Sequence, residues 1–394
     1  MKAIIYNSVA HGSYDVIPSK SMLHRYIICA SLADGKSIIN NYQESDDVLA
    51  TINAFSKFGI KFSKKDGALI IDSSGIEDLD EVVVDANESA TTLRLLAPIL
   101  IKYAHKVTFI GKPNLLNRPM DEYKKLFGSD IEVNDDKIII KNAINGDTLY
   151  VDASVSSQFV SGVILASLLK RTPTTIIIQG KITSSSYIDL TINAAKSFGA
   201  NIKRDENVIY VLPSRLESKI VTVEADYTHA ASFIALSKIN HHIDIVGLND
   251  NSLQADKAIY ELLKQDEINL ENNIDLGPIL FCYAACRNKR TKFIGTNRLM
   301  VKESNRLQAM KEELAKFGVN IQIYDDVCFI DGKESLSTTQ TLASHNDHRI
   351  CMSLAILASI CKNKVELDGI ECVNKSYPNF FNDLKSLGIK IEII

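Results

Sequence analysis

The sequence lacks an apolar run of membrane-spanning length, since the longest runs, such as Leu95–Ile101, are far shorter than a transmembrane helix requires. It also lacks a recognisable leader. The apolar stretch in Met1–Asn7 is too short for a signal-peptide core, and no small-residue cleavage pattern follows it. These absences argue against a membrane or secreted protein, so we expect a cytoplasmic one.

A strong excess of either charge is also missing. The formal net charge is -4, charged residues make up 23% of the chain, and apolar residues make up 46%. This balance is ordinary for a globular protein and argues against binding to nucleic acid or to a membrane surface. Any binding site for anions must therefore be built locally, from a few basic side chains that the fold brings together.

Cysteines in metal-binding or disulfide patterns are absent as well. The seven cysteines are scattered through apolar segments such as Leu280–Cys286, without CxxC pairs or neighbouring histidine clusters. Buried free thiols fit this pattern better than disulfides, a metal site or a catalytic nucleophile. We therefore expect no bound metal.

The chain does contain a recurring unit, in which a segment of helical periodicity ends at a glycine and is followed by a strand-like segment. The clearest copies are Thr51–Ile60, Ile192–Asn201, Met310–Val319 and Phe381–Ile389. Weaker copies lie at Tyr123–Ile140 and at Asp256–Leu270, where Gln265 takes the place of the glycine. Because 394 residues exceed the usual size of one core, we expect two similar α/β domains of three units each. The alternative is that this order of elements is merely common in α/β proteins.

The expected domain boundary lies in Val221–His229, where a strand runs into a new helix between the third and fourth units. The strand that ends near Gly12 precedes the first unit, and we assign it to the second half of the chain. The expected domains are therefore residues 1–12 plus 227–394, and residues 13–226.

A basic segment at the start of an apolar helix is the first candidate for a binding site. Pro18–Ser19 favours a helix start with free backbone N–H groups, to which Lys20 adds a mobile charge and Arg25 a bidentate fork. These groups together suit a phosphate or carboxylate, although an ordinary cap followed by a basic turn is the alternative. Arg118 is held out of helical geometry by Pro119 and is either a second anion ligand or an isolated surface arginine.

Neutral polar groups gather at two further points of the first half. Ser156–Gln158 precedes the apolar segment 159–169, so its side chains and the helix-start amides could hold phosphate oxygens without net charge. An ordinary helix cap is the alternative. Ser184 and Tyr187 supply a second set of neutral donors.

The second half is richer in charge. Lys302, Glu303 and Arg306 are spaced so that they would lie on adjoining faces of a helix, and an exposed ion-pair ladder is the alternative to a site. Two further polar clusters, Asn346–Arg349 before an apolar helix and Asn374–Pro378, favour a binding site.

A carboxylate in this half is the candidate for proton transfer. Asp275 precedes a strongly apolar segment, 276–285, that is expected to be helical. At the mouth of such a helix it is either a general base or simply the N-cap, and the sequence leaves both open.

Taken together, these segments resemble the enolpyruvyl transferase family over the whole chain, and within it the members that act on shikimate-3-phosphate. The matching segments, in family order, are Ser19–Ser21 with Arg25, Ser45–Val48, Thr91–Arg94, Arg118–Pro119, Ser156–Gln158, Tyr187–Asp189, Lys302–Glu303 with Arg306, and Asn346–Arg349. The resemblance implies an α/β fold of two similar domains, each of three βαβαββ units in an inside-out α/β barrel, with the substrates in the interdomain cleft.

The resemblance also implies a reaction and a set of residues. The enolpyruvyl group of phosphoenolpyruvate would pass to the 5-hydroxyl of shikimate-3-phosphate, with loss of phosphate and without a cofactor. Residues implied for shikimate-3-phosphate are Lys20, Ser21, Arg25, Ser156, Ser157, Gln158, Ser184, Tyr187, Asp275 and Lys302. Residues implied for phosphoenolpyruvate are Lys20, Ala90, Arg118, Gln158, Glu303, Arg306, His348, Arg349 and Lys375. Asp275 would take the hydroxyl proton, and Glu303 or Lys20 would protonate C3.

Two other functions remain open. One is enolpyruvyl transfer to UDP-N-acetylglucosamine, which is disfavoured because Ser21 follows Lys20 where that sister enzyme has Asn. The other is a non-catalytic anion-binding protein on the same scaffold, which could dispense with Asp275 and Glu303, although both are present. We expect a monomer whose partners are small-molecule substrates.

The chain departs from the family pattern at several positions. Pro18 and Ala90 stand where glycine is usual, and Asn305 stands where Asp is usual. The methyl group of Ala90 would narrow the phosphoenolpyruvate side of the site. We therefore expect weak inhibition by glyphosate, whose length is critical in that space.

Overall fold

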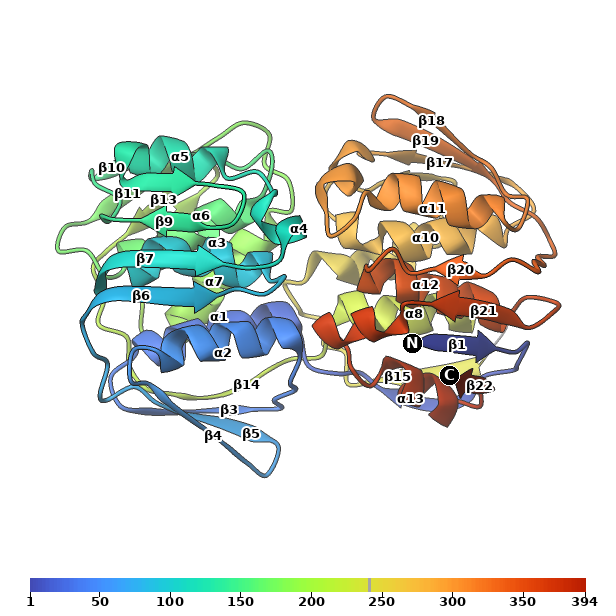
Figure 1. The fold of residues 1–394 in the computed structure, drawn as a ribbon, viewed down its shortest axis with the longest axis horizontal. Helices are drawn as coiled ribbons and strands as arrows, with labels where there is room; N and C mark the ends of the chain where they lie inside the picture. Colours follow the sequence, from blue (N-terminus) through green and yellow to red (C-terminus); the bar gives the residue numbers. More distant parts are fainter. Residues whose placement is uncertain (240–241) are drawn as a thin grey trace. The chain divides into compact units, whose positions relative to one another are not determined.

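Two compact units make up the part of the chain that the computed structural model describes, residues 1–239 and 242–394 (Figure 1). Unit 1 consists of Met1–Ile17 and Ala225–Ile394, and unit 2 consists of Pro18–Glu224. The first boundary falls after residue 17 rather than after residue 12, because strand β2 (His11–Asp15) pairs in parallel with β15 (His242–Val246) of unit 1.

Unit 2 contains three four-stranded sheets that share one pattern. In each sheet the first strand runs parallel to the second, and the remaining neighbours are antiparallel; the sheet orders are β14-β3-β5-β4, β6-β7-β9-β8 and β10-β11-β13-β12. The strands are β3 (Lys36–Asn40), β4 (Lys61–Lys65), β5 (Ala68–Asp72), β6 (Leu79–Asp85), β7 (Ala104–Ile110), β8 (Ile131–Val133), β9 (Ile138–Ile140), β10 (Thr148–Asp152), β11 (Thr174–Gln179), β12 (Ile202–Asp205), β13 (Val208–Val211) and β14 (Ile220–Thr222). The helices are α1 (Lys20–Leu32), α2 (Asp46–Ser56), α3 (Ala90–Leu100), α4 (Pro113–Leu116), α5 (Asp121–Phe127), α6 (Ser157–Ser167) and α7 (Ser186–Ser197).

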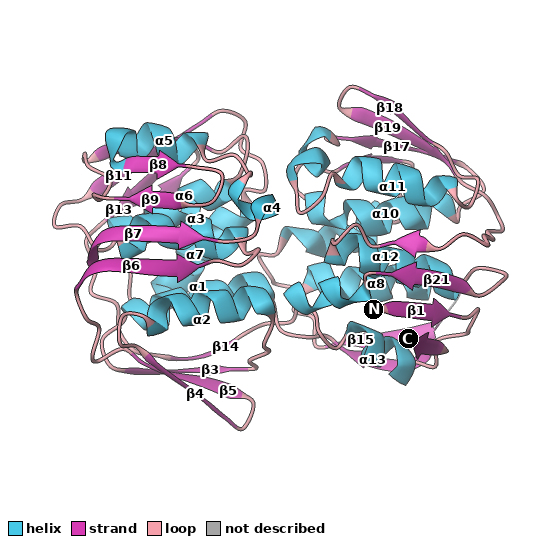
Figure 2. Ribbon diagram, viewed as in Figure 1, coloured by secondary structure: helices cyan, strands magenta, loops and turns pink. Residues whose placement is uncertain are grey.

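Helices rather than strands form the centre of unit 2. Every residue from Met22 to Ser31 in α1 is buried, and α3 and α6 are buried on nearly all sides. The strands instead alternate, as in β6, where Val82 and Val84 are buried while Val83 is exposed. A helix that is apolar all round must lie inside a core, whereas an alternating strand covers it with one face. Figure 2 shows these helices lying between the sheets of the unit.

Unit 1 repeats this plan. Its four-stranded sheets have the orders β16-β17-β19-β18 and β20-β21-β1-β22, and among the described residues its third sheet is the parallel pair β15-β2. The remaining strands are β1 (Lys2–Ile5), β16 (Glu267–Asn269), β17 (Arg290–Ile294), β18 (Ile321–Tyr324), β19 (Val327–Asp331), β20 (Leu342–Ala343), β21 (Val365–Asp368) and β22 (Ile391–Ile393). The α-helices are α8 (Tyr227–Ile239), α9 (Ile259–Leu262), α10 (Gly277–Ala285), α11 (Arg306–Ala315), α12 (His348–Ser359) and α13 (Phe380–Ser386). The expected α/β fold of two units built from repeats is confirmed.

The glycine of the recurring unit has the conformation that its position predicts. Gly59 follows α2 with φ +81°, in the left-handed region that is strained for side chains with a Cβ. The other repeat glycines, Gly128, Gly199, Gly318 and Gly388, also have positive φ, whereas Gln265 is not among the residues with positive φ. The helical segment of this weaker copy therefore ends without a residue of positive φ at position 265.

The cysteine side chains and the lengths of the helices bear on two predictions made from the sequence. All seven cysteines are free; six are buried and Cys286 is partly buried, as expected. Within residues 1–239 and 242–394, we find no helix that combines the length and the apolar character needed to cross a bilayer.

Candidate active site

The first candidate residues lie at the start of α1 in unit 2. Ser19 is the N-cap, and its hydroxyl accepts a hydrogen bond from the backbone N–H of Met22 at 3.5 Å. Lys20, the first helical residue, donates from Nζ to Asp47 Oδ2 at 2.7 Å, and only 16% of its side chain is exposed. The helix start predicted from Pro18–Ser19 is therefore present. Asp47, the second residue of the neighbouring α2, keeps the ammonium group in place.

Arg25, one turn further along α1, is almost completely buried and held by neutral oxygens. Its Nε donates to Thr191 Oγ1 at 2.8 Å, and its terminal nitrogens donate to the backbone oxygens of Ser21 at 2.8 Å and Tyr187 at 3.0 Å. Burial lowers the pKa of Arg25 to about 10. Because each terminal nitrogen carries a second N–H, the outer edge of the guanidinium can still donate to a ligand.

The start of α6 carries the three neutral candidates. Ser156 is the N-cap, and its Oγ accepts from the backbone N–H of Gln158 at 3.3 Å. The Gln158 side chain is fixed at both ends: Nε2 donates to Thr91 Oγ1 at 3.1 Å, and Oε1 accepts from Arg94 at 3.3 Å. Ser157 is buried at the first helical position. The predicted helix is confirmed, with a start two residues earlier than the apolar pattern indicated.

Arg94, the last residue of the segment Thr91–Arg94, was not among the candidate residues predicted from the sequence. In the structure its contacts join two segments that carry candidates. Besides Gln158, it donates to the backbone oxygen of Pro119 at 2.9 Å, next to the candidate Arg118, and it lies 4.8 Å from the ring centre of Phe159. It thus ties the start of α6 to the segment that carries Arg118. Its position at (i, i+3) from Thr91 on α3 was the signal available in the sequence.

Three further candidates of unit 2 lie at or just before helix starts, whereas Arg118 lies between α4 and α5. Ala90 is the first residue of α3, after the N-cap Ser89, and is 8% exposed. Ser184 is buried and has φ +56°, a left-handed conformation that is uncommon for a residue with a Cβ. Such strain clusters at ligand-binding sites, and Tyr187 follows in the first turn of α7.

In unit 1, Arg306 is the centre of a cluster of charged side chains. Its Nε donates to Asp347 Oδ2 at 2.8 Å, its Nη1 to Asp275 Oδ1 at 2.7 Å, and its Nη2 to Glu303 Oε2 at 2.8 Å. Only 1% of its side chain is exposed. Burial lowers the pKa of Arg306, but the three carboxylates outweigh burial and raise the pKa above its usual value.

Asp275 is the carboxylate of this cluster that also contacts Lys302, whose Nζ lies 3.3 Å from Asp275 Oδ1. Burial raises the pKa of Asp275, but Lys302, Arg306 and Arg349 outweigh it and hold the pKa well below the usual range. Burial also lowers the pKa of Lys302, an effect that Asp275 partly offsets. The side chain of Asp275 does not cap α10, whose N-cap position is Leu276, so the N-cap alternative is wrong.

The expected helical placement of Lys302 and Glu303 is wrong. Both residues precede α11, which begins at Arg306 because the side chain of Asn305 caps it by accepting from Gln308 N at 3.1 Å. Asn is a strong N-cap residue, and it therefore stops the helix from extending backwards. The side chains are not an exposed ladder either, since only 22% of Lys302 and 16% of Glu303 is exposed.

The start of α12 holds the next pair of candidates. Its N-cap Asp347 is fully buried and accepts from the backbone N–H of Arg349 at 2.9 Å, while its other oxygen binds Arg306. His348 and Arg349 occupy the first turn and are mostly buried. With the other residues in 1–239 and 242–394, the guanidinium of Arg349 forms no hydrogen bond or ion pair. Lys375 ends the short helix Ile370–Lys375 and is 5% exposed.

A buried carboxylate that the sequence analysis missed lies behind Asp275. Asp256 accepts from Thr228 Oγ1 at 2.6 Å and from Asn273 Nδ2 at 3.0 Å. Burial raises the pKa of Asp256 to about 6, and the charge of Asp275 adds to that rise. Asn273 lies two residues before Asp275 in the chain. Asp256 therefore anchors the turn that carries the candidate base, and its position in a repeat segment gave no sign of this.

A search of the described residues for three or more His, Cys, Asp or Glu side chains placed to hold a metal ion finds no such group. The acidic side chains around Arg306 are instead satisfied by cations of the protein.

Comparisons with known proteins identify the family of the chain. The family model described as EPSP synthase (3-phosphoshikimate 1-carboxyvinyltransferase) matches residues 8–267 and 258–384. Curated relatives named 3-phosphoshikimate 1-carboxyvinyltransferase include those of Clostridioides difficile, 34% identical with 98% of each chain covered, and of Clostridium botulinum, 35% identical with 98% of this chain and 96% of the relative covered. A solved EPSP synthase from Acinetobacter baumannii shares the fold, with a TM-score of 0.80, 24% identity and 99% of each chain covered. The chain therefore belongs to the EPSP synthase family.

Proposed function

We propose that this protein transfers the enolpyruvyl group of phosphoenolpyruvate to the 5-hydroxyl of shikimate-3-phosphate and releases phosphate. The observation that carries the proposal is the cluster in which Asp275, an ionised carboxylate, contacts Lys302 and Arg306. A base held beside cations suits the activation of a hydroxyl group on an anionic substrate. Membership of the EPSP synthase family supports the same reaction.

The acceptor is proposed to bind mainly to unit 2. Its phosphate carries about -1.5 to -2 charges near neutrality, and neutral donors at a helix start can hold phosphate oxygens. The proposed acceptor ligands are Lys20, Ser21, Arg25, Ser156, Ser157, Gln158, Ser184 and Tyr187, together with Asp275 and Lys302 of unit 1. Arg25 differs from the other two cations of this set, Lys20 and Lys302, because its hydrogen-bond partners are neutral oxygens rather than a carboxylate.

Phosphoenolpyruvate is proposed to bind to a second, more basic set of residues. Its proposed ligands are Lys20, Ala90, Arg118, Gln158, Glu303, Arg306, His348, Arg349 and Lys375. Among them Arg349 has a guanidinium that forms no hydrogen bond or ion pair with the described residues, so it can bind phosphate or carboxylate oxygens in a bidentate way.

The proton chemistry is assigned to three residues. The acceptor hydroxyl adds to C2 of the enolpyruvyl group while C3 is protonated; loss of phosphate from C2 and of a proton from C3 then restores the double bond. Asp275 takes the hydroxyl proton, and Glu303 or Lys20 delivers the proton to C3. Substrate anions that bind Lys302 and Arg306 would compensate their charge, so the pKa of Asp275 would rise from its depressed value.

The test is release of phosphate from phosphoenolpyruvate with shikimate-3-phosphate, with UDP-N-acetylglucosamine, and with no acceptor. Release that depends on shikimate-3-phosphate supports the proposal. Release that depends on UDP-N-acetylglucosamine would assign the chain to the sister reaction. No acceptor-dependent release would favour a non-catalytic anion-binding protein.

Ala90 gives a prediction about inhibition. We predict weak inhibition by glyphosate, because the Ala90 methyl group narrows the phosphoenolpyruvate side, and we predict that Ala90→Gly increases sensitivity. The measurement is half-inhibition at a phosphoenolpyruvate concentration near KM for both proteins. Half-inhibition of the unaltered protein at low micromolar glyphosate would contradict the prediction.

We also propose that the protein acts as a monomer in the cytoplasm. Its free cysteines are typical of a reducing compartment. Sedimentation equilibrium at micromolar concentration measures the mass directly, and a dimer mass would contradict the monomer.

A further inference from the structure

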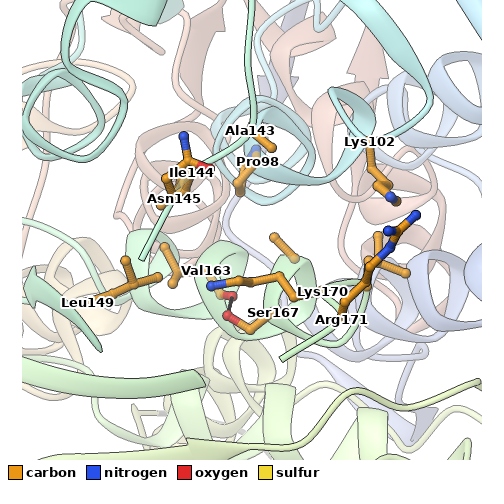
Figure 3. Close-up of a pocket in the computed structure, with 12 residues that line it drawn as sticks. Pro98, Lys102, Ala143, Ile144, Asn145, Leu149, Val163, Ser167, Lys170 and Arg171 are labelled. Atoms are coloured by element: carbon orange, nitrogen blue, oxygen red, sulfur yellow. Dashed lines mark hydrogen bonds between the residues drawn. The ribbon is translucent and has the colours of Figure 1, made fainter. Parts of the chain in front are cut away.

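A pocket in unit 2 lies where α3 and α6 end (Figure 3). Its volume is about 260 Å³, and apolar side chains of Pro98, Ile144, Leu149 and Val163 form much of its lining. These four side chains are buried or nearly so, whereas the pocket itself is open to a ligand. A dry cavity of about 150 Å³ is enough to hold benzene. The space therefore accommodates an aromatic ring with small substituents.

Basic side chains lie at the edge of this apolar space. Lys170 donates to the backbone oxygen of Gly146 and lies 3.7 Å from Asp147. Lys102 and Arg171 are exposed, and their side chains form no hydrogen bond or ion pair with other residues in the described ranges. Figure 3 shows their charged ends on the same side of the pocket. Two cations are thus available to a ligand that fills the apolar space.

Helix geometry explains only part of this arrangement. The C-terminal ends of α3 and α6 attract cations, which accounts for basic residues just after each helix. It does not account for the apolar lining between them, because apolar surface left in contact with water forgoes the stabilisation that burial would give. We propose that the pocket binds a small organic anion with a ring-sized apolar body, such as an aromatic carboxylate.

This pocket is separate from the proposed substrate residues. Ser157 begins α6 and Ser167 ends it, a helix of 11 residues that spans about 16 Å. The proposed substrate residues of these two helices lie at the starts of α3 and α6, and the pocket lies at their ends. An anion in the pocket therefore does not compete directly with phosphate bound at the helix starts.

Salicylate is a suitable probe, because it is a fluorescent aromatic carboxylate, and salicylamide is its neutral counterpart. The experiment is a fluorescence titration of the full chain without substrates. The test variant is Lys102→Glu with Arg171→Glu, two exposed positions at which charge reversal leaves the core untouched. The control is Lys61→Glu with Lys65→Glu, which makes the same change of net charge on the exposed strand β4.

We expect saturable binding of salicylate that is at least tenfold weaker in the test variant and unchanged in the control. Salicylamide should bind more weakly than salicylate to the unaltered protein, and inorganic phosphate should not displace salicylate. Equal affinity in the test and control variants, no saturation, or competitive displacement by phosphate would each overturn the proposal. Turnover measured in the same variants tests the proposed reaction separately, because the titration contains no substrate.

Discussion

Arg25 and Arg306 are both buried arginines, but they differ in how their charge is balanced. Arg25 is bound only by hydroxyl and backbone oxygens, so its charge stays available to a phosphate. Arg306 is bound by three carboxylates, so the protein itself neutralises much of its charge. The sequence identified both arginines as candidates. It could not reveal this difference, because the partners of each arginine come from distant segments of the chain.

The contact between Asp347 and Arg306 predicts the effect of a substitution at Asp347. Asp347→Asn keeps a good N-cap for α12 but removes a negative charge from Arg306. The Asn amide nitrogen cannot accept the hydrogen bonds that Arg306 donates, so we expect the free energy of unfolding to fall by about 1–3 kcal/mol, while KM for phosphoenolpyruvate changes several-fold and kcat changes less. Steady-state kinetics and urea unfolding provide the two measurements. A large loss of stability with unchanged KM would show that Asp347 serves only the helix.

Asp275 yields a prediction about catalysis itself. Asp275→Asn preserves the size of the side chain but cannot accept a proton, so we expect kcat to fall by about 10²–10⁴-fold. The matched control is Asp331→Asn, an exposed carboxylate in the same unit, which should leave kcat unchanged. Turnover of the Asp275 variant within threefold of the unaltered protein would remove the general-base role.

At the scale of secondary-structure elements, apolar helices were predicted better than polar loops. The apolar composition of α1, α6 and α12 predicted these buried helices, because a helix that is apolar on all sides is stable only inside a core. The spacing of Lys302, Glu303 and Arg306 predicted a helix over this segment. In the structure α11 begins only after the N-cap Asn305. Spacing gives the periodicity of a helix but not its first residue.

The Asp256 network ties α8 to the turn before α10, and it gives a prediction about pH. The pKa of Asp256 is about 6 in the folded chain against an ordinary value of 3.8, so the folded state binds more protons between these pH values. Its contribution to stability is therefore present below pH 3.8 and is lost as pH rises through 6, by about 3 kcal/mol in total.

Asp256→Asn removes this ionisation and isolates the effect. The stability of the unaltered protein relative to the variant should fall as pH rises from about 4 to about 6 and stay constant above about 7. Urea unfolding of both proteins across this range measures the difference. A difference that is independent of pH would show that Asp256 has an ordinary pKa.

The close approach of α3 and α6 gives a prediction about packing. A Cβ at Gly162 would lie 2.5 Å from the backbone oxygen of Arg94 and 2.3 Å from the hydroxyl of Tyr123. Gly162→Ala should therefore destabilise unit 2 by about 1–3 kcal/mol, because one of the helices must move. Gly75→Ala is the control, since a Cβ there meets no atom within 4 Å. Equal unfolding midpoints for the two variants would contradict the packing argument.

At the scale of the whole molecule, repeats in the sequence predicted the two-unit architecture, while local motifs supplied the candidate site residues, whose roles stay predictions. Five repeat glycines have the left-handed conformation expected at helix ends, which is why the units were visible in the sequence. The first boundary differed because the pairing of β2 with β15 joins segments more than 200 residues apart. Long-range pairing of this kind leaves no local signal. The role of Asp256 was not predicted for the same reason, because its partners Thr228 and Asn273 lie in other segments of the chain.

The most direct test of the proposed reaction is to identify its products. The full chain is incubated with phosphoenolpyruvate and shikimate-3-phosphate, the phosphate released is counted, and the organic product is analysed by mass spectrometry and NMR. We predict one carboxyvinyl ether at the 5-oxygen of shikimate-3-phosphate for each phosphate released. Recovery of unchanged shikimate-3-phosphate, or phosphate release without the new ether, would contradict enolpyruvyl transfer by this protein.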